Sequence, residues 1–300
     1  MIHIDDRPAG FDEVVGHESI VKSLKKSLAD PKRPHVFLFT GPSGVGKTTL
    51  ARICAQMLGA EGVGIIEKNI SNETGVDSAR DLINESYLTP MEGKIRAYIL
   101  DEVDKASDSW QAAMKKPMED VPEHTYYFLC TEFADKVKKA IRTRSLEYTL
   151  APLKDDDMLY LLKKMTRKYE KDLSMKVLEA IVERAGGAPR QGLMLLQEVM
   201  DVENEEEALE LVAAEATTPE VRELCQKLLK KASWKEIAPV LKGVKEDAET
   251  VRRIVLGYMN AVLLNSGASR AFDLIEIFEA SVFYSGKPGI SRMCYEACLE

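Results

Sequence analysis

Short apolar runs alternate with helical patterns in the first half of the chain. Residues 36–40 (VFLFT), 95–100 (IRAYIL) and 125–130 (TYYFLC) are rich in β-branched and aromatic side chains, and polar residues follow each run. These features predict buried strands. Apolar positions at helical spacing predict helices over 48–58 and 109–119. Such alternation indicates a parallel sheet covered on both faces, with a ligand at the carboxyl ends of the strands.

The pattern changes after Thr149, where the strand signal stops and helical segments with charged faces begin. These segments span 155–170, 175–185 and 190–202. The change places a domain boundary near Ala151.

A second boundary lies beyond the acidic stretch 201–210, which leads into the linker AAEATTPE. In this linker Thr218 is predicted to cap a helix that begins near Pro219. Helices with breaks near Gly243, Gly267 and 285–289 are predicted for the rest of the chain. The predicted domains are 1–151, 152–205 and 206–300.

Composition narrows the classes of protein. The 300 residues carry 41 Lys+Arg and 49 Asp+Glu, a formal charge of −8, and 45% are hydrophobic. This excess of acidic residues argues against a protein whose whole surface binds nucleic acid, although it does not exclude a local basic groove. The chain shows neither a membrane-spanning apolar run nor a secretory signal, which predicts a cytoplasmic protein. The five cysteines lack zinc or disulfide spacing and are predicted to be reduced core thiols.

A glycine-rich segment directly after the strand at 36–40 carries the strongest chemical signal. Residues 41–48 (GPSGVGKT) match G-x-x-x-x-G-K-[ST] between a strand and a helix. The glycines allow backbone N–H groups to point inward at a polyphosphate, and the helix adds its positive end. Lys47 is predicted to reach the β- and γ-phosphates of a nucleotide, and Thr48 to supply a hydroxyl to Mg²⁺. The predicted phosphate-binding residues are Gly41, Pro42, Ser43, Gly44, Val45, Gly46, Lys47, Thr48 and Thr49.

A second acidic element follows the strand at 95–100. This strand leads directly into Asp101-Glu102-Val103-Asp104. Carboxylates that emerge from a strand beside a phosphate loop suit the remaining parts of a nucleotide site. Asp101 is predicted to hold Mg²⁺, and Glu102 to polarise the attacking water.

With these residues in place, the chain resembles the AAA+ ATPases and, among them, the clamp-loader ATPase subunits: the bacterial DNA polymerase III gamma subunit, the small subunits of replication factor C, and their phage counterparts. Residues 7–17 (RPAGFDEVVGH) resemble the N-terminal box of the family, which in relatives packs around adenine. This resemblance assigns Val14, Val15 and Gly16 to the nucleotide site. Residues 118–124 (MEDVPEH) are similar to the end of the family's helix-and-turn motif.

Three further motifs of the family can be matched to this chain. Thr131, after the strand at 125–130, resembles the sensor 1 residue that feels the γ-phosphate and aligns water. Arg144 in IRTRS (141–145) resembles the arginine that relatives extend into the ATP site of a neighbouring subunit, with Arg142 as the alternative. A guanidinium there stabilises charge that develops on the transferred phosphate. Arg190 in GGAPRQGL (186–193) resembles the sensor 2 arginine, which contacts the γ-phosphate of its own subunit.

The resemblance also points to a DNA-facing surface. Residues 69–80 (NISNETGVDSAR) are similar to the segment that faces DNA in the central chamber of related loaders, with Arg80 kept and Thr74 in place of an arginine. By analogy, Asn69 restrains Glu102 until DNA binds. Lys136 and Lys138, in a local basic run, are predicted to neutralise phosphates of the DNA backbone without reading its sequence.

The resemblance implies a five-stranded AAA+ domain over 1–151, a helical lid over 152–205 and a helical collar over 206–300. The implied activity is an ATPase, stimulated by DNA and clamp, that loads a sliding clamp onto primer–template DNA in a ring of several subunits, with ATP and Mg²⁺. The alternatives are another AAA+ machine, such as a branch-migration motor or helicase loader, and a non-hydrolysing structural subunit. The segment 59–67 holds no cysteine for the zinc module of the bacterial gamma subunit. A phage-type loader, working in the host cytoplasm, is therefore one option.

Overall fold

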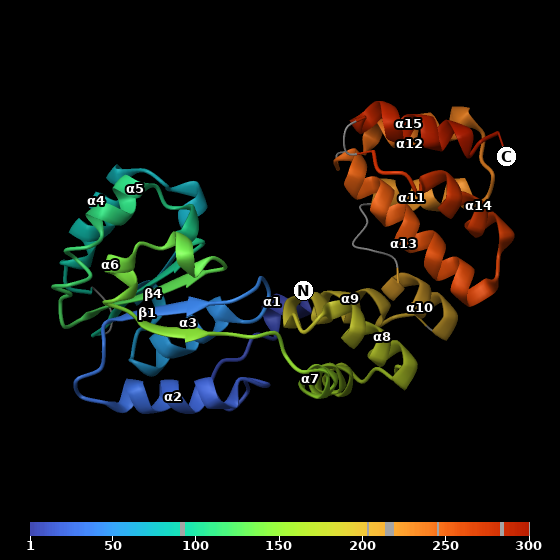
Figure 1. Cartoon of the computed structure of the whole chain (residues 1–300). Coiled ribbons are helices and arrows are strands. Elements are labelled where there is room, and N and C mark those ends of the chain that lie inside the picture. Colours follow the sequence, from blue (N-terminus) through green and yellow to red (C-terminus); the bar gives the residue numbers. More distant parts are fainter. Residues whose placement is uncertain (91–93, 203, 214–218, 245, 283–284, 300) are drawn as a thin grey trace. The chain divides into compact units, whose positions relative to one another are not determined.

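Five parallel strands form one sheet in the computed structural model of the chain, which describes residues 1–300 apart from 91–93, 203, 214–218, 245, 283–284 and 300 (Figure 1). The order across the sheet is β2-β3-β4-β1-β5, and every neighbouring pair is parallel. The strands are β1 (Val36–Thr40), β2 (Ile65–Asn69), β3 (Arg96–Asp101), β4 (Thr125–Thr131) and β5 (Leu146–Thr149). The predicted parallel five-stranded sheet is confirmed. Strands β3 and β4 each extend to a predicted site residue, Asp101 and Thr131.

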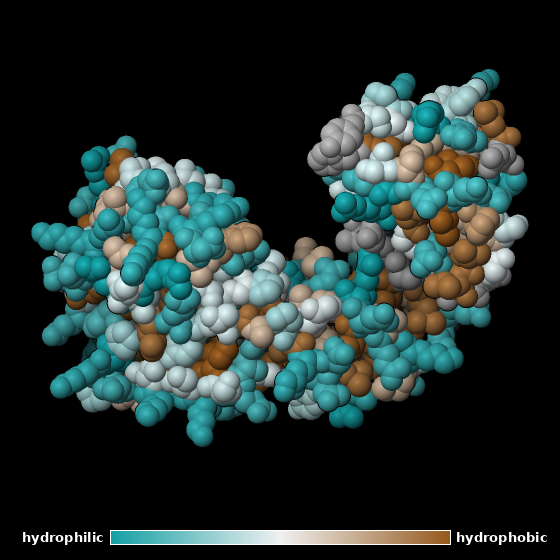
Figure 2. Space-filling model, viewed as in Figure 1, coloured by the Kyte–Doolittle hydropathy of each residue, from teal (hydrophilic) through white to brown (hydrophobic). Residues whose placement is uncertain are grey.

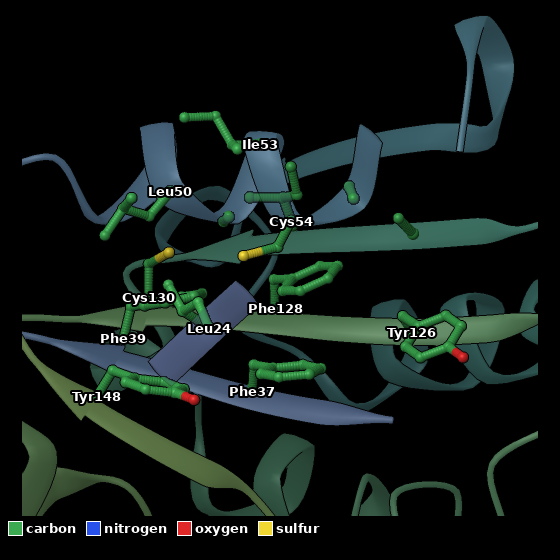
Figure 3. Close-up of a cluster of buried hydrophobic side chains, with 14 of the residues drawn as sticks. Leu24, Phe37, Phe39, Leu50, Ile53, Cys54, Tyr126, Phe128, Cys130 and Tyr148 are labelled. Atoms are coloured by element: carbon green, nitrogen blue, oxygen red, sulfur yellow. The ribbon is translucent and has the colours of Figure 1, made fainter. Parts of the chain in front are cut away.

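Helices cover both faces of this sheet, as the apolar character of the strands requires. On one face α2 (Glu18–Ala29) and α3 (Lys47–Met57) pack on Phe37 and Phe128, the cluster drawn in Figure 3. On the other face, α4 (Val76–Ser86) and α5 (Asp108–Ala113) pack on alternate residues of the same strands. Short helices α1 (Ile2–Asp5) and α6 (Lys139–Arg142) and the longer α7 (Asp155–Lys168) belong to the same part of the chain.

Helix α5 is shorter than the predicted 109–119, because it ends at Ala113 and irregular turns follow. Pro117 explains the difference. Proline has no N–H to continue the helical hydrogen bonds, and it disfavours helical backbone at Lys116. The chain therefore turns before Glu119, which lies on the surface.

The described chain separates into two compact units, one of residues 1–171 with 185–197 and the other of 172–184 with 198–300. The two predicted domain boundaries stay predictions. The remaining helices are α8 (Met175–Ala185), α9 (Pro189–Val199), α10 (Glu205–Ala213), α11 (Pro219–Leu229), α12 (Trp234–Gly243), α13 (Ala248–Ser266), α14 (Ser269–Phe278) and α15 (Gly286–Glu296).

The second unit has its own core, in which Leu224, Val255 and Phe278 are completely buried. Figure 2 shows hydrophobic side chains among hydrophilic ones on the visible face of α13. The break predicted at 285–289 is wrong in part, since α15 already begins at Gly286, and the predicted cap Thr218 lies outside the described residues. No helix among the described residues is long and apolar enough to cross a membrane.

The cysteines match the prediction of reduced thiols. Cys54, Cys130, Cys225 and Cys294 are buried, Cys298 is partly exposed, and none forms a disulfide. Burial raises the pKa of Cys294 to about 12, which keeps this thiol protonated.

Candidate active site

The phosphate loop connects β1 to α3 at the carboxyl edge of the sheet. Gly41 has φ +139°, and a Cβ there would lie 2.2 Å from the carbonyl oxygen of Leu150, so only glycine fits. Gly46 has φ +106° and stands immediately before α3. The loop therefore delivers the first turn of α3, with its unpaired backbone N–H groups, to the mouth of the site, where an anion binds favourably.

Lys47 is buried, with 7% of its surface exposed, and its ammonium group is folded onto the loop itself. Nζ donates to the carbonyl oxygens of Gly41 (2.8 Å) and Pro42 (2.7 Å). Burial lowers the pKa of Lys47, and the negative charge of nearby Glu132 is the strongest influence that raises it. A desolvated cation held only by carbonyl oxygens gains strongly from an anionic ligand, so Lys47 fits the predicted role of phosphate binding.

Thr48 and Asp101 bring two hard oxygen ligands together. The Thr48 hydroxyl donates to Oδ2 of Asp101 at 2.8 Å, and Oδ1 of Asp101 accepts the backbone N–H of Glu102 at 2.9 Å. Hydroxyl and carboxylate oxygens at this spacing fit the ligand preference of Mg²⁺. Glu102 itself has a left-handed backbone, with φ +54° and ψ +41°, which is uncommon for a residue with a side chain.

Thr131 ends β4, where the register pairs it with Thr40 at the end of β1. Its side chain is buried, with 1% exposed. The hydroxyl donates to Oδ1 of Asp104 at 2.7 Å and accepts the backbone N–H of Phe133 at 3.0 Å. The structure therefore places Thr131 at the site and gives it a carboxylate partner that the sequence motif did not identify.

A cavity of about 500 Å³ joins these parts, all within the first unit. The predicted binding, metal-ligand and catalytic residues that line it are Val14, Val15, Ser43, Gly44, Val45, Gly46, Lys47, Thr48, Thr49, Asp101, Glu102, Thr131 and Arg190. Gly16 does not line the cavity, but a Cβ there would lie 2.5 Å from the side chain of Leu153, which does. The volume is within the range of small-molecule sites.

Two positively charged groups extend the wall of the cavity beyond Lys47. The backbone N–H of Arg190, at the start of α9, donates to the carbonyl oxygen of Gly44 at 3.3 Å, which holds this helix against the phosphate loop. Arg7 also lines the cavity, and burial together with the nearby Arg52 and Arg190 lowers its pKa. The cavity therefore combines positive charge around the phosphate loop with carboxylates at the strand ends.

The two candidate finger arginines lie elsewhere. They precede β5, at the amino edge of the sheet, whereas the phosphate loop lies at the carboxyl edge, so neither can serve the site of its own subunit. Arg142 contacts Glu147 at 3.1 Å. Arg144 donates to Glu119 at 2.8 Å and to the carbonyl oxygen of Ala140 at 2.7 Å. Both guanidinium groups therefore already have carboxylate partners in the single chain.

The predicted DNA contacts are on the surface and are partly engaged. Arg80 donates to Asp77 at 2.8 Å, and Lys138 to a carboxylate oxygen of Asp108 at 2.8 Å. Lys136 lies over the ring of Phe133, 4.3 Å from its centroid.

The two predicted residues nearer β2 make local contacts. Thr74 accepts the backbone N–H of Ser107 through its carbonyl oxygen. Asn69 accepts the backbone N–H (2.9 Å) and the hydroxyl (2.7 Å) of Ser71, and it lies opposite Asp101 in the sheet register. Its proposed restraint of Glu102 stays a prediction.

Known proteins are similar to this chain in sequence and in fold. The family described as DNA polymerase III, delta subunit, matches residues 61–154. The DNA polymerase III subunit gamma of Buchnera aphidicola (subsp. Schizaphis graminum) is 31% identical over 216 residues, 65% of this chain and 59% of that protein. The replication factor C small subunit of Staphylothermus marinus is 32% identical over 195 residues, 64% of this chain and 59% of that protein. These matches support the resemblance of this chain to the clamp-loader ATPase subunits among the AAA+ proteins.

A protein other than these clamp-loader relatives shares the fold. The Holliday junction branch migration motor RuvB of Thermotoga maritima superposes with a TM-score of 0.57 over 87% of this chain and 91% of that one, at 21% identity. At that identity the likeness shows the AAA+ fold alone. The chain also spans 59% of the two clamp-loader relatives above, less than two thirds of their length.

Three acidic residues at or near the candidate site are not assigned a role by the sequence motifs. Asp104 belongs to the D-E box but had no assigned role, Glu132 lines the cavity beside Lys47, and Glu119 holds Arg144. The position of each acid in or next to a motif is visible in the sequence. Their partners are not, since the Asp104–Thr131 and Glu119–Arg144 contacts join residues 27 and 25 positions apart.

Proposed function

We propose that this chain hydrolyses ATP as a subunit of a ring-shaped clamp loader, which places a sliding clamp on primer–template DNA. The observation that carries the proposal is the convergence of Lys47, the Thr48–Asp101 pair and Glu102 in one cavity. The clamp-loader relatives support the choice of process. A non-hydrolysing structural subunit would not need an intact Glu102 behind an intact phosphate loop.

The residues divide the work of hydrolysis. Backbone N–H groups of the loop and the ammonium of Lys47 bind the phosphates, and Arg190 approaches from α9. Thr48 and Asp101 would hold Mg²⁺, which when bound neutralises charge on the phosphate oxygens. Glu102 orients the attacking water and accepts its proton. The catalytic power expected here comes mainly from positioning and electrostatics.

The amino edge of the sheet supports assembly into a ring. Arg144 lies at the opposite edge of the sheet from the cavity, so its proposed role requires a neighbouring subunit, with Arg142 as the alternative. The C-terminal unit exposes large apolar side chains, among them Leu264 (77%) and Phe272 (57%), which fit a collar that contacts other subunits. Arg80, Thr74, Lys136 and Lys138 are the proposed contacts to the DNA backbone.

The test is reconstitution of the full chain with its candidate partner subunits and clamp. We expect ATP turnover that rises when both clamp and primer–template DNA are added, and ATP-dependent retention of labelled clamp on circular DNA. Lys47→Ala should lose both. ATP turnover stimulated by four-way junctions but not by clamp would favour a branch-migration motor instead, and absence of turnover in every combination would favour a structural subunit.

A further inference from the structure

Asp104 is a buried carboxylate for which hydrolysis, as described above, has no use. It lies in the short turn Val103–Lys105, two residues after Glu102, and 3% of its side chain is exposed. Oδ1 accepts the hydroxyl of Thr131 at 2.7 Å, while the ammonium of Lys105 is 3.9 Å from Oδ2 and is itself half exposed. Burying a carboxylate is costly without good partners, so the Thr131 hydroxyl is a major part of its stabilisation.

This contact decides what Thr131 can do. A threonine hydroxyl has one proton to donate and two lone pairs that accept. The proton is directed at Asp104, and one lone pair receives the backbone N–H of Phe133 at 3.0 Å. One lone pair is left on a residue that lines the cavity. In this arrangement Thr131 can accept a hydrogen bond from water, but it has no proton left for an oxygen of an ionised phosphate.

The same contact fixes the segment that carries Glu102. The backbone N–H of Glu102 donates to Asp101 at 2.9 Å, and its carbonyl oxygen accepts the backbone N–H of Lys105 at 2.9 Å. Asp104 then ties this turn to the end of β4 through Thr131. The left-handed backbone of Glu102 is therefore restrained on both sides, and such strained conformations persist only where their surroundings impose them.

We propose that Asp104 is a positioning residue for ATP hydrolysis: by accepting the hydrogen bond from the Thr131 hydroxyl, it leaves Thr131 as an acceptor for the attacking water, and it holds the Glu102 turn in place. The inference rests on the proposed hydrolysis of ATP. The water oxygen bonds to the γ-phosphorus as the bond from that phosphorus to the β–γ bridging oxygen breaks. One water proton passes to Glu102 and the other stays on the phosphate product. Thr131 and Asp104 exchange no proton.

Four substitutions separate this role from direct phosphate binding. Thr131→Val and Asp104→Ala remove the contact, whereas Thr131→Ser and Asp104→Asn keep a hydroxyl donor and an oxygen acceptor. For the full chain in its loader complex, we measure kcat, KM and the Kd for a fluorescent ATP analogue. The two removing variants should lose about tenfold or more in kcat, since misplacing a reacting group is costly, with Kd within threefold of the wild type.

Control variants test whether a loss of kcat comes from the Asp104–Thr131 contact. Thr131→Ser and Asp104→Asn should stay within threefold of wild-type kcat, and the Thr131→Val/Asp104→Ala double variant should be no slower than the slower single one, because both remove the same contact. Asp30→Asn, an exposed matched charge change, should leave kcat unchanged. Thermal unfolding checks that each variant is folded. If Asp104→Ala does not fold, Thr131→Val still tests the proposal, because valine is close in shape to threonine and removes the same contact.

Three results would overturn the proposal. They are wild-type kcat in Thr131→Val, a loss of ATP affinity in Thr131→Val as large as its loss of turnover, and an Asp104→Asn variant as slow as Asp104→Ala. The second would make Thr131 a phosphate ligand, and the third would show that charge matters rather than the acceptor. A wild-type complex that binds ATP without hydrolysing it would instead refute the proposed function.

Discussion

The two edges of the parallel sheet present opposite kinds of chemistry. At the carboxyl edge, groups from β1, β3 and β4 converge on one cavity and are largely buried, as Lys47 (7% exposed) and Thr131 (1%) illustrate. At the amino edge, Arg142 and Arg144 keep 39% and 30% of their side chains exposed, and each contacts a surface glutamate. The first edge gathers candidate phosphate-binding and metal-binding groups in one cavity, whereas the arginines at the second edge lie outside that cavity.

The largest effect is expected at the carboxyl edge. Glu102→Gln keeps the shape of the side chain but removes the base, so turnover should fall about 100-fold or more. ATP affinity should stay within a few fold, because Glu102 is not a phosphate ligand. Rapid-quench hydrolysis together with equilibrium binding of ATP checks both values. Turnover near that of the wild type would show that Glu102 is not the base for the attacking water. A loss of ATP affinity as large as the loss of turnover would make Glu102 a nucleotide-binding residue instead.

The next effect tests whether the amino edge acts on a neighbour. Arg144→Ala should lower turnover of the assembled ring about 100-fold, since a finger arginine stabilises transition-state charge, and should leave ATP binding by the single chain unchanged. Arg142→Ala is the matched control, two positions away and paired with Glu147. If Arg142→Ala is the slower variant, the finger is Arg142.

Mixed rings sharpen the same comparison. A subunit with Arg144→Ala keeps an intact cavity, and a subunit with Lys47→Ala keeps an intact finger. Rings that contain both should recover part of the turnover that each variant lacks alone. Failure to recover any turnover at any mixing ratio would mean that the two edges do not work across a subunit boundary.

The candidate groups at the carboxyl edge could be located from the sequence because they lie in continuous segments. The phosphate loop directly follows β1, and Asp101 directly follows an apolar run, so strand and motif could be recognised together. The amino edge was predicted only as a list of candidate arginines. Their restraint by Glu119 and Glu147 depends on where the turn after α5 and the strand β5 lie in space. Pro117, which shortens α5, is visible in the sequence, but the helical periodicity around it predicts a longer helix.

A smaller effect is expected from Glu132, the acid that lines the cavity beside Lys47. Its negative charge acts favourably on the Lys47 ammonium, but it would repel the phosphates of bound ATP. Glu132→Gln should therefore bind ATP about two- to fivefold more tightly, as expected for a solvent-exposed charge, and the gain should shrink at high salt. Titrations at two ionic strengths measure this. Weaker binding would mean that Glu132 supports the site rather than opposing its ligand.

The smallest effect concerns the support behind the phosphate loop. His17 Nε2 lies 3.3 Å from the carbonyl oxygen of Val45, and burial lowers the pKa of His17 below its usual 6.5. As the pH falls through about 6.5, the unfolded chain gains a proton that the folded chain does not, so the folded state loses stability. His17→Asn removes the titrating imidazole, and asparagine tolerates the left-handed φ of +55° at this position. Between pH 7.5 and 5.5, the Tm of the ATP-free wild type should therefore fall about 1–2 °C more than that of His17→Asn. If the Tm of the wild type and that of His17→Asn fall equally with pH, the His17 imidazole binds its proton equally well in the folded and unfolded chain. The phosphate loop would then not depend on a neutral histidine.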